Sequence, residues 1–109
     1  MELARFAAVA GELLDGLGDR LSRQTREAVR TYLSTGEDGL AVDELAGALC
    51  LEQTRVSSAE HDLLRELLDA FAVDEIDAKS YPWLHARERV LATLNVTDAP
   101  PDPAAPCER

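Results

Sequence analysis

The sequence predicts an all-α fold, a compact bundle of about five short helices. Apolar residues recur at helical spacing in five separate stretches, while strand-like alternation is absent over any run of useful length. The hydrophobic fraction of 46% is enough to build a core, and a length of 109 residues suits one domain. The stretches are joined by short connections, which favour antiparallel neighbours. We therefore expect one helical domain over residues 1–96.

The first predicted helix covers residues 2–17. Its apolar positions fall at helical spacing: Leu3, Phe6, Ala7, Ala10, Leu13, Leu14 and Leu17. Gly16 and Gly18 are expected to end it, because glycine tolerates left-handed conformations. Ser22 is a suitable N-cap for a second helix that extends to about Ser34. Residues 35–39 then hold two glycines three apart, which predicts a turn.

The third predicted helix runs from Leu40 to about Glu52, with Gly47 in its middle. Glycine there costs around 1 kcal/mol of helix propensity relative to alanine, which indicates close approach of a neighbouring helix. Cys50 in this helix suits a small buried hydrophobe. Ser57 and Glu60 then form the pattern of a capping box, which predicts a fourth helix that extends to about residue 71.

A fifth helix is predicted to begin near Pro82, since proline is tolerated in a first helical turn. Its apolar face includes Trp83 and Val90, and we expect Arg87 to extend its charged head from that face to solvent. Four of the five prolines fall in the last ten residues. Residues 97–109 are therefore predicted to be a disordered, Pro-rich tail.

The net charge of the chain is −10, from 21 acidic and 11 basic residues. Proteins that bind phosphates need clustered lysine and arginine, so this balance argues against nucleic acid as a direct ligand. No stretch approaches the roughly 18 uninterrupted apolar residues that a bilayer crossing needs, and the first residues lack the basic start of a secretory signal. The two cysteines make no disulfide framework, so we expect a cytoplasmic protein.

The negative charge is concentrated in one segment. Residues 37–77 hold 12 acidic and two basic residues, which accounts for the whole net charge of −10, and the remainder of the chain is neutral. Such asymmetry is what a surface facing a basic partner would produce, although a pair of well-solvated helices explains it equally well. Asp62, Glu66 and Asp69 are four and three residues apart, so they share one face of the fourth predicted helix.

The candidate partner-binding residues are therefore acidic: Glu37, Asp38, Asp43, Glu44, Asp62, Glu66 and Asp69. Asp74, Glu75 and Asp77 form a second, weaker candidate cluster in a loop. A catalytic nucleophile needs an adjacent base, and the sequence suggests none for Ser57, Ser58 or Cys50. The carboxylates lack the regular spacing of a calcium-binding loop. We predict no enzymatic activity, no cofactor and no metal site.

The order of motifs between Leu21 and Trp83 resembles the MafI-type family of small bacterial immunity proteins. The motifs follow one another in this order: a Ser-capped helix, a Gly-Glu turn, an amphipathic helix with an acidic-Leu-Ala centre, a second Ser-capped helix and an aromatic segment. The matching stretches are Leu21-Ser22, Ser34 to Ala41, Asp43 to Ala46, Ala48-Leu49, Val56-Ser57, Asp62 to Leu64, Leu67-Leu68 and Tyr81-Pro82-Trp83. The Gly-Glu-x-Gly-x-Ala turn at residues 36–41 is the most specific of them. The resemblance covers a little over half of the chain.

This resemblance implies an inhibitor that neutralises the toxin domain of a secreted polymorphic toxin, often a nuclease, in the cytoplasm of the producing cell. Because a nuclease is basic where it grips phosphates, an acidic inhibitor can occupy that surface. Two alternatives stay open. One is a helical adaptor or secretion chaperone that binds its partner through an apolar groove. The other is a small metal-dependent hydrolase built on the carboxylates, which would bind divalent metal tightly.

Overall fold

The computed structural model of this protein describes residues 2–72 and 76–97. In chain order the elements are α1 (Leu3–Leu17), the 3₁₀ helix η1 (Gly18–Arg20), α2 (Arg23–Ser34), α3 (Asp38–Leu51), β1 (Arg55–Val56), α4 (Ser58–Asp69), α5 (Pro82–His85), α6 (Arg87–Thr93) and β2 (Asn95–Val96). The fold is all-α, as the periodicity predicts. Residues 98–109 of the predicted tail lie outside the described part of the chain.

The predicted helix boundaries are confirmed where local capping determines them. Gly18 follows the last turn of α1 with φ of +50°, the left-handed region that favours glycine. The Ser22 side chain accepts a hydrogen bond from the Thr25 N–H at the start of α2. At the start of α4, Ser57 and Glu60 form a complete capping box. These contacts satisfy N–H groups that the first turn of each helix leaves without a partner.

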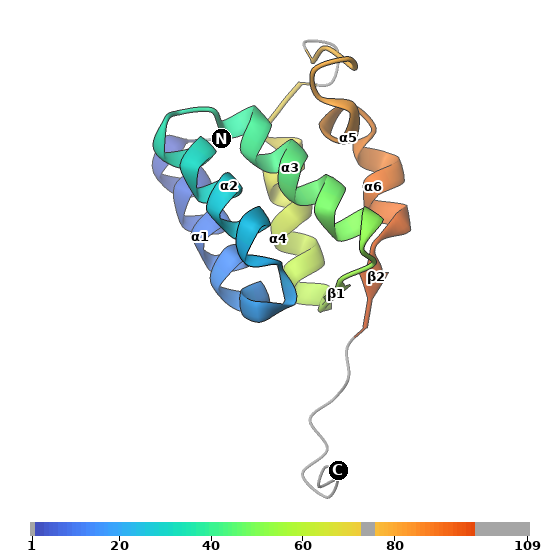
Figure 1. Ribbon diagram of the computed structural model, residues 1–109. Helices are drawn as coiled ribbons and strands as arrows, with labels where there is room; N and C mark the ends of the chain where they lie inside the picture. Colours follow the sequence, from blue (N-terminus) through green and yellow to red (C-terminus); the bar gives the residue numbers. More distant parts are fainter. Residues whose placement is uncertain (1, 73–75, 98–109) are drawn as a thin grey trace, which may run out of the picture.

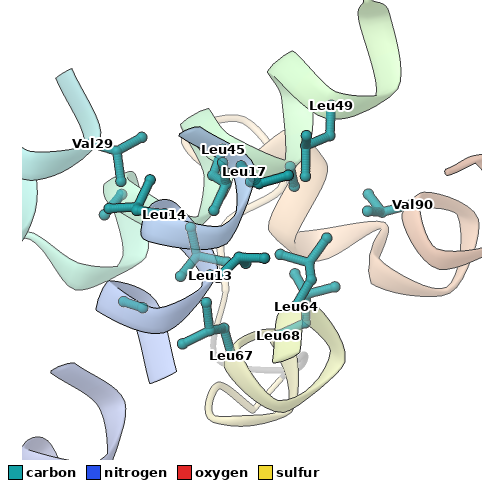
Figure 2. Close-up of a cluster of buried hydrophobic side chains, with 14 of the residues drawn as sticks. Leu13, Leu14, Leu17, Val29, Leu45, Leu49, Leu64, Leu67, Leu68 and Val90 are labelled. Carbon is teal, nitrogen blue, oxygen red and sulfur yellow. The ribbon is translucent and has the colours of Figure 1, made fainter. Parts of the chain in front are cut away.

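The helices enclose one core of aliphatic side chains (Figure 2). The closest helix neighbours are α2 with α3 and α1 with α4, and Figure 1 shows α2 and α3 in front of α4. The most deeply buried side chains come from every long helix: Leu13 and Leu17 of α1, Val29 of α2, Leu45 and Leu49 of α3, and Leu64, Leu67 and Leu68 of α4. Burial of each such side chain contributes roughly 1.5–3 kcal/mol. This core is what holds the exposed faces of α3 and α4 in place.

The prediction of one continuous fifth helix is wrong. The segment forms two short helices, α5 and α6, which are separated at Ala86, whose φ of −98° and ψ of 38° leave the helical region. The break lets both pieces pack on the core, where Leu84 of α5 and Val90 of α6 are each 1% exposed. Residue spacing alone did not indicate this turn, because the apolar positions on either side continue nearly in register.

The expectation that Arg87 extends its head to solvent is also wrong. Its Nη1 donates hydrogen bonds to the backbone carbonyls of Leu68 and Phe71, at 3.2 and 2.9 Å. These carbonyls lie at the end of α4, where a helix leaves acceptors without intrahelical donors. Arg87 therefore ties α6 to the end of α4.

Two very short strands complete the fold. β1 and β2 pair in parallel, with Arg55 opposite Asn95 and Val56 opposite Val96. The pairing joins the loop after α3 to the end of α6, next to the Thr97 N–H, which donates to the Val56 carbonyl at 2.8 Å. A two-residue strand is too short to produce an alternating pattern in the sequence. Among the described helices, none combines the length and apolar character that a membrane span requires.

Candidate functional site

The structure divides the seven predicted contact residues between two helices. Four belong to α3 and the residue before it: Glu37, Asp38, Asp43 and Glu44. The other three belong to α4: Asp62, Glu66 and Asp69. Leu45 of α3 and Leu64 of α4 are both buried in the same core, so each of the two helices turns an apolar face inward.

The α4 carboxylates share the outer face of the helix, as their spacing predicts, but each has a partner within the fold. Glu66 lies 2.6 Å from a guanidinium nitrogen of Arg5 in α1. Asp69 lies 3.7 Å from the Arg87 guanidinium, and Asp62 lies 3.5 Å from a ring nitrogen of the adjacent histidine. Two arginines of this chain thus reduce the repulsion between like charges four and three residues apart.

Asp43 has a structural position that the sequence analysis did not identify. Its Oδ1 accepts hydrogen bonds from the backbone N–H groups of Trp83 and Leu84, at 2.8 and 2.9 Å. These are donors of the first turn of α5, which has no cap from its own preceding residue. Asp43 therefore caps α5 from 40 residues away in the sequence and holds that helix against α3.

The other carboxylates of α3 and of the two residues that flank it cap no described helix through their side chains. Glu37, Asp38, Glu44 and Glu52 make no side-chain hydrogen bond or ion pair with any residue that the structure describes. Glu37 and Asp38 lie at the start of α3, whereas Glu44 lies midway along its outer face. Glu52, the residue directly after α3, is exposed and was not among the predicted contacts. No arginine, lysine or histidine of the described residues is paired with these carboxylates.

A groove runs between α3 and α5, and we call it the α3–α5 groove. Glu44, Ala48, Leu51 and Glu52 line it from α3 and the residue after, and Trp83 lines it from α5. Gly47 and Asp43 of α3 and Thr25 of α2 complete its lining. Within the described ranges, no lysine or arginine lines this groove. It combines acidic side chains with an aromatic ring and an aliphatic side chain.

Leu51 is the apolar residue that stands out in this groove. Its exposed fraction is 74%, whereas Leu45 and Leu49 of the same helix are 2% and 0% exposed. The helical spacing contains the signal that the sequence analysis missed: a position two residues after Leu49 is turned about 200° away from it on a helix of 3.6 residues per turn. Leu51 thus belongs to the outer face, together with Glu44.

Gly47 explains why Trp83 can lie so close to α3. A Cβ atom at this glycine would lie 2.6 Å from the indole Nε1 and 2.7 Å from Cδ1. No real Cβ contact is so short, so only glycine allows the ring to rest on the helix backbone. This confirms the close approach that the glycine predicts, with an aromatic side chain of α5 as the neighbour.

A second groove, between α1 and α2, is predominantly apolar. Phe6, Gly11 and Leu14 line it from α1, and Leu33 lines it from α2. Its volume is about 560 Å³, and the charged residues at it are Arg30 and Asp38. A Cβ added at Gly11 would meet no atom within 4 Å. The groove is of the kind that the adaptor alternative requires.

Glu60, another acidic residue of the 37–77 segment, lies inside the structure. Its carboxylate accepts hydrogen bonds from Arg20 Nη1 at 2.9 Å, from Arg20 Nη2 at 2.6 Å and from the Ser57 N–H at 2.8 Å. The same guanidinium also donates to the carbonyls of Gly16 and Arg55. Burial by itself raises the pKa of Glu60, but the hydrogen bonds and positive charge of Arg20, with the Ser57 N–H, outweigh it and hold the pKa below 4.5.

The loop cluster is described only in part, since Asp74 and Glu75 lie outside the described residues. Asp77 accepts hydrogen bonds from the Lys79 N–H and the Ser80 hydroxyl, both at 3.0 Å, and so stabilises its own turn. Cys50 is buried, as expected, and burial raises the pKa of its thiol. Among residues 2–72 and 76–97, no three His, Cys, Asp or Glu side chains gather closely enough to hold a metal ion.

Comparisons with models of protein families, with curated proteins and with solved structures gave no match to this chain. The case for its function therefore depends on the geometry and charge described above, together with the motif order between Leu21 and Trp83.

Proposed function

We propose that this chain is a cytoplasmic immunity protein that binds and neutralises a cognate bacterial toxin domain, a nuclease, through an acidic helical surface. The observation that carries the proposal is the uncompensated charge of α3. Glu37, Glu44 and Glu52 are exposed and have no ion-pair partner in the described fold. The chain would act by occupying the partner's basic surface and would need no cofactor.

Electrostatic physics favours this role. Complementary potentials steer association and raise rate constants to about 10⁸ M⁻¹s⁻¹ or more at low salt. A nuclease must present basic groups to the phosphates of its substrate, so a net charge of −10 on the inhibitor matches it. Fast capture is useful to a cell that makes a lethal enzyme, because each toxin molecule must be bound before it acts.

The test is to express this chain together with the toxin domain encoded beside its gene, and to measure survival and binding affinity by calorimetry. We expect the wild-type chain to protect the cells and to bind with an affinity that falls steeply as salt is added. A variant with Glu37→Gln, Asp38→Asn and Glu44→Gln should bind more weakly and with a smaller salt dependence. Glu12→Gln, an exposed change on α1, is the control. Unaltered affinity and salt dependence in the triple variant would show that the acidic-surface mechanism is wrong.

The corresponding α4 variant, Asp62→Asn, Glu66→Gln and Asp69→Asn, tests the other half of the predicted surface. Because Arg5 and Arg87 already lie beside two of these carboxylates, we expect a smaller loss of affinity than for the α3 variant. A larger loss would assign the contact to α4 and remove α3 from the proposal.

The α1–α2 groove supports a second candidate, a helical adaptor or secretion chaperone. The apolar lining from Phe6, Leu14 and Leu33 suits the apolar face of a partner helix. Binding through this groove would depend weakly on salt and would be lost when Gly11→Leu fills it. Retention of binding in that variant, with steep salt dependence, would favour the immunity role instead.

A further inference from the structure

We infer that the α3–α5 groove is the specific docking site on the acidic surface, and that it takes an arginine side chain of the partner next to an apolar residue. The inference rests on the proposed function, because it assumes a basic protein partner. It goes further by naming one groove and the side-chain chemistry that the groove recognises.

Charge is the first reason to choose this groove over the α4 face. Glu44 and Glu52 border it, and neither has a partner within the described fold. On α4, a cation of the partner would compete with Arg5 for Glu66 and with Arg87 for Asp69. An arginine that enters the groove gains its carboxylate partners without displacing an existing ion pair.

The apolar content is the second reason. Leu51, 74% exposed, offers an aliphatic surface in the same groove as the half-buried indole of Trp83. Binding energy at protein interfaces is concentrated in such aromatic and aliphatic anchors within a polar rim. A guanidinium can also lie against an indole ring, where the ring quadrupole attracts it. The α3–α5 groove thus combines both parts of the chemistry. The α1–α2 groove, by contrast, is mainly apolar, and its lining has one acidic residue, Asp38, beside the basic Arg30.

The groove is also held rigid before binding. Asp43 accepts hydrogen bonds from the Trp83 and Leu84 N–H groups, at 2.8 and 2.9 Å, and so fixes the start of α5. The indole packs against Gly47 at a distance that leaves no room for a Cβ. A prearranged site loses little conformational entropy when a partner binds, which increases affinity.

Trp83 is the single tryptophan of the chain, so its fluorescence reports on this groove alone. The probe is the capped pentapeptide Gln-Arg-Leu-Arg-Gln, and the control peptide replaces its leucine by glutamine. We expect the first peptide to alter Trp83 emission saturably and to shift the amide resonances of Glu44, Ala48 and Leu51. The control peptide should bind at least about fivefold more weakly.

Three variants make the measurement specific. We expect Glu44→Gln and Leu51→Ala each to weaken peptide binding by at least about fivefold. Glu12→Gln removes the same charge from α1, away from the groove, and should weaken binding much less than Glu44→Gln does. The inference is overturned if no saturable binding occurs, if the shifts centre on α4, or if Glu12→Gln weakens binding as much as Glu44→Gln does.

The same variants separate the inference from the proposed function when the toxin domain encoded beside the gene is the ligand. If Glu44→Gln and Leu51→Ala neutralise the toxin as well as the wild-type chain does, the function stands and the groove assignment is wrong. If the wild-type chain fails to bind the toxin but binds the peptide at Trp83, the groove stands and the immunity role is wrong.

Discussion

Replacement of Glu60 by glutamine is expected to destabilise the fold far more than removal of an exposed carboxylate. In the wild-type chain, this carboxylate receives two N–H groups of Arg20 and the Ser57 N–H, and its side chain is 10% exposed. Glutamine preserves the length and one acceptor oxygen but removes the negative charge. The Arg20 guanidinium then retains its bonds to two carbonyls but loses its counter-ion.

The magnitude follows from the degree of burial of the two partners. Hydrogen bonds to charged groups contribute about 1.5–3 kcal/mol, and removal of one member of a fully buried ion pair costs about 3–5 kcal/mol. Arg20 is 35% exposed, so water can solvate part of its charge in the variant. We therefore expect Glu60→Gln to lower the free energy of unfolding by about 2 kcal/mol at pH 7.

The measurement is urea-induced unfolding followed by circular dichroism, with Glu27→Gln as the matched control. Glu27 also pairs with an arginine, Arg23 at 3.0 Å, but its side chain is 65% exposed. Exposed pairs of this kind contribute about 0.3–0.5 kcal/mol. If the two variants lose the same stability within about 0.5 kcal/mol, the Glu60 network is not desolvated as described and the reasoning fails.

The pH dependence of the same variant provides an independent check. Because the pKa of Glu60 is held below 4.5 in the folded chain, its ionised form stabilises the fold above that pH. This contribution is lost as the pH falls through the folded-state pKa. The difference in unfolding free energy between wild type and Glu60→Gln should therefore be constant near pH 7 and shrink below pH 4.5. A difference that grows with acidification would contradict the assigned charge state.

Further predictions concern the glycines and caps that shape the grooves. Gly47→Ala should cost about 1 kcal/mol net, because displacement of the Trp83 ring outweighs the gain in helix propensity; a stability equal to wild type with unshifted emission would refute the close contact. Gly11→Ala, where the added Cβ meets open space, should instead stabilise by about 0.5–1 kcal/mol in the same urea assay. Asp43→Ala and Ser57→Ala each remove a helix cap, and each should lower the unfolding free energy by about 0.5–2 kcal/mol.

Local sequence patterns predicted those features of the fold that depend on residues close together in the chain. The start of α4 could be predicted because Ser57 and Glu60 are three residues apart, and the tight packing at Gly47 because a mid-helix glycine needs a reason. The partners across the fold could not be predicted, since Arg20 reaches Glu60 and Asp43 reaches α5 over 40 residues. Those contacts depend on how the helices pack, which periodicity does not specify.

The candidate binding surface shows the same difference between local patterns, which the sequence reveals, and contacts across the fold, which it does not. Sequence position alone cannot tell which carboxylates of the 37–77 segment already have partners in the fold, and the prediction included Asp43, Glu66 and Asp69 as contacts. The structure places these three against α5, Arg5 and Arg87, where they already stabilise the fold. Leu51 and Glu52 were not selected, although the structure exposes both. Outward position on α3, rather than residue type, is what distinguishes them.

Some carboxylates of this chain stabilise the described fold and others have no partner in it, and this difference changes what the net charge of −10 implies for binding. Long-range steering depends on every exposed carboxylate, whether or not it has a partner, because the field sums over all charges. Short-range affinity depends on the carboxylates that form new ion pairs with the partner, and our proposal places those on α3 and at its ends. Loss of a charge on either helix should therefore slow association similarly at low salt, whereas only loss of Glu44 or its neighbours should speed dissociation. Association and dissociation rate constants, measured separately, therefore distinguish long-range electrostatic steering from direct contact more clearly than the equilibrium affinity does.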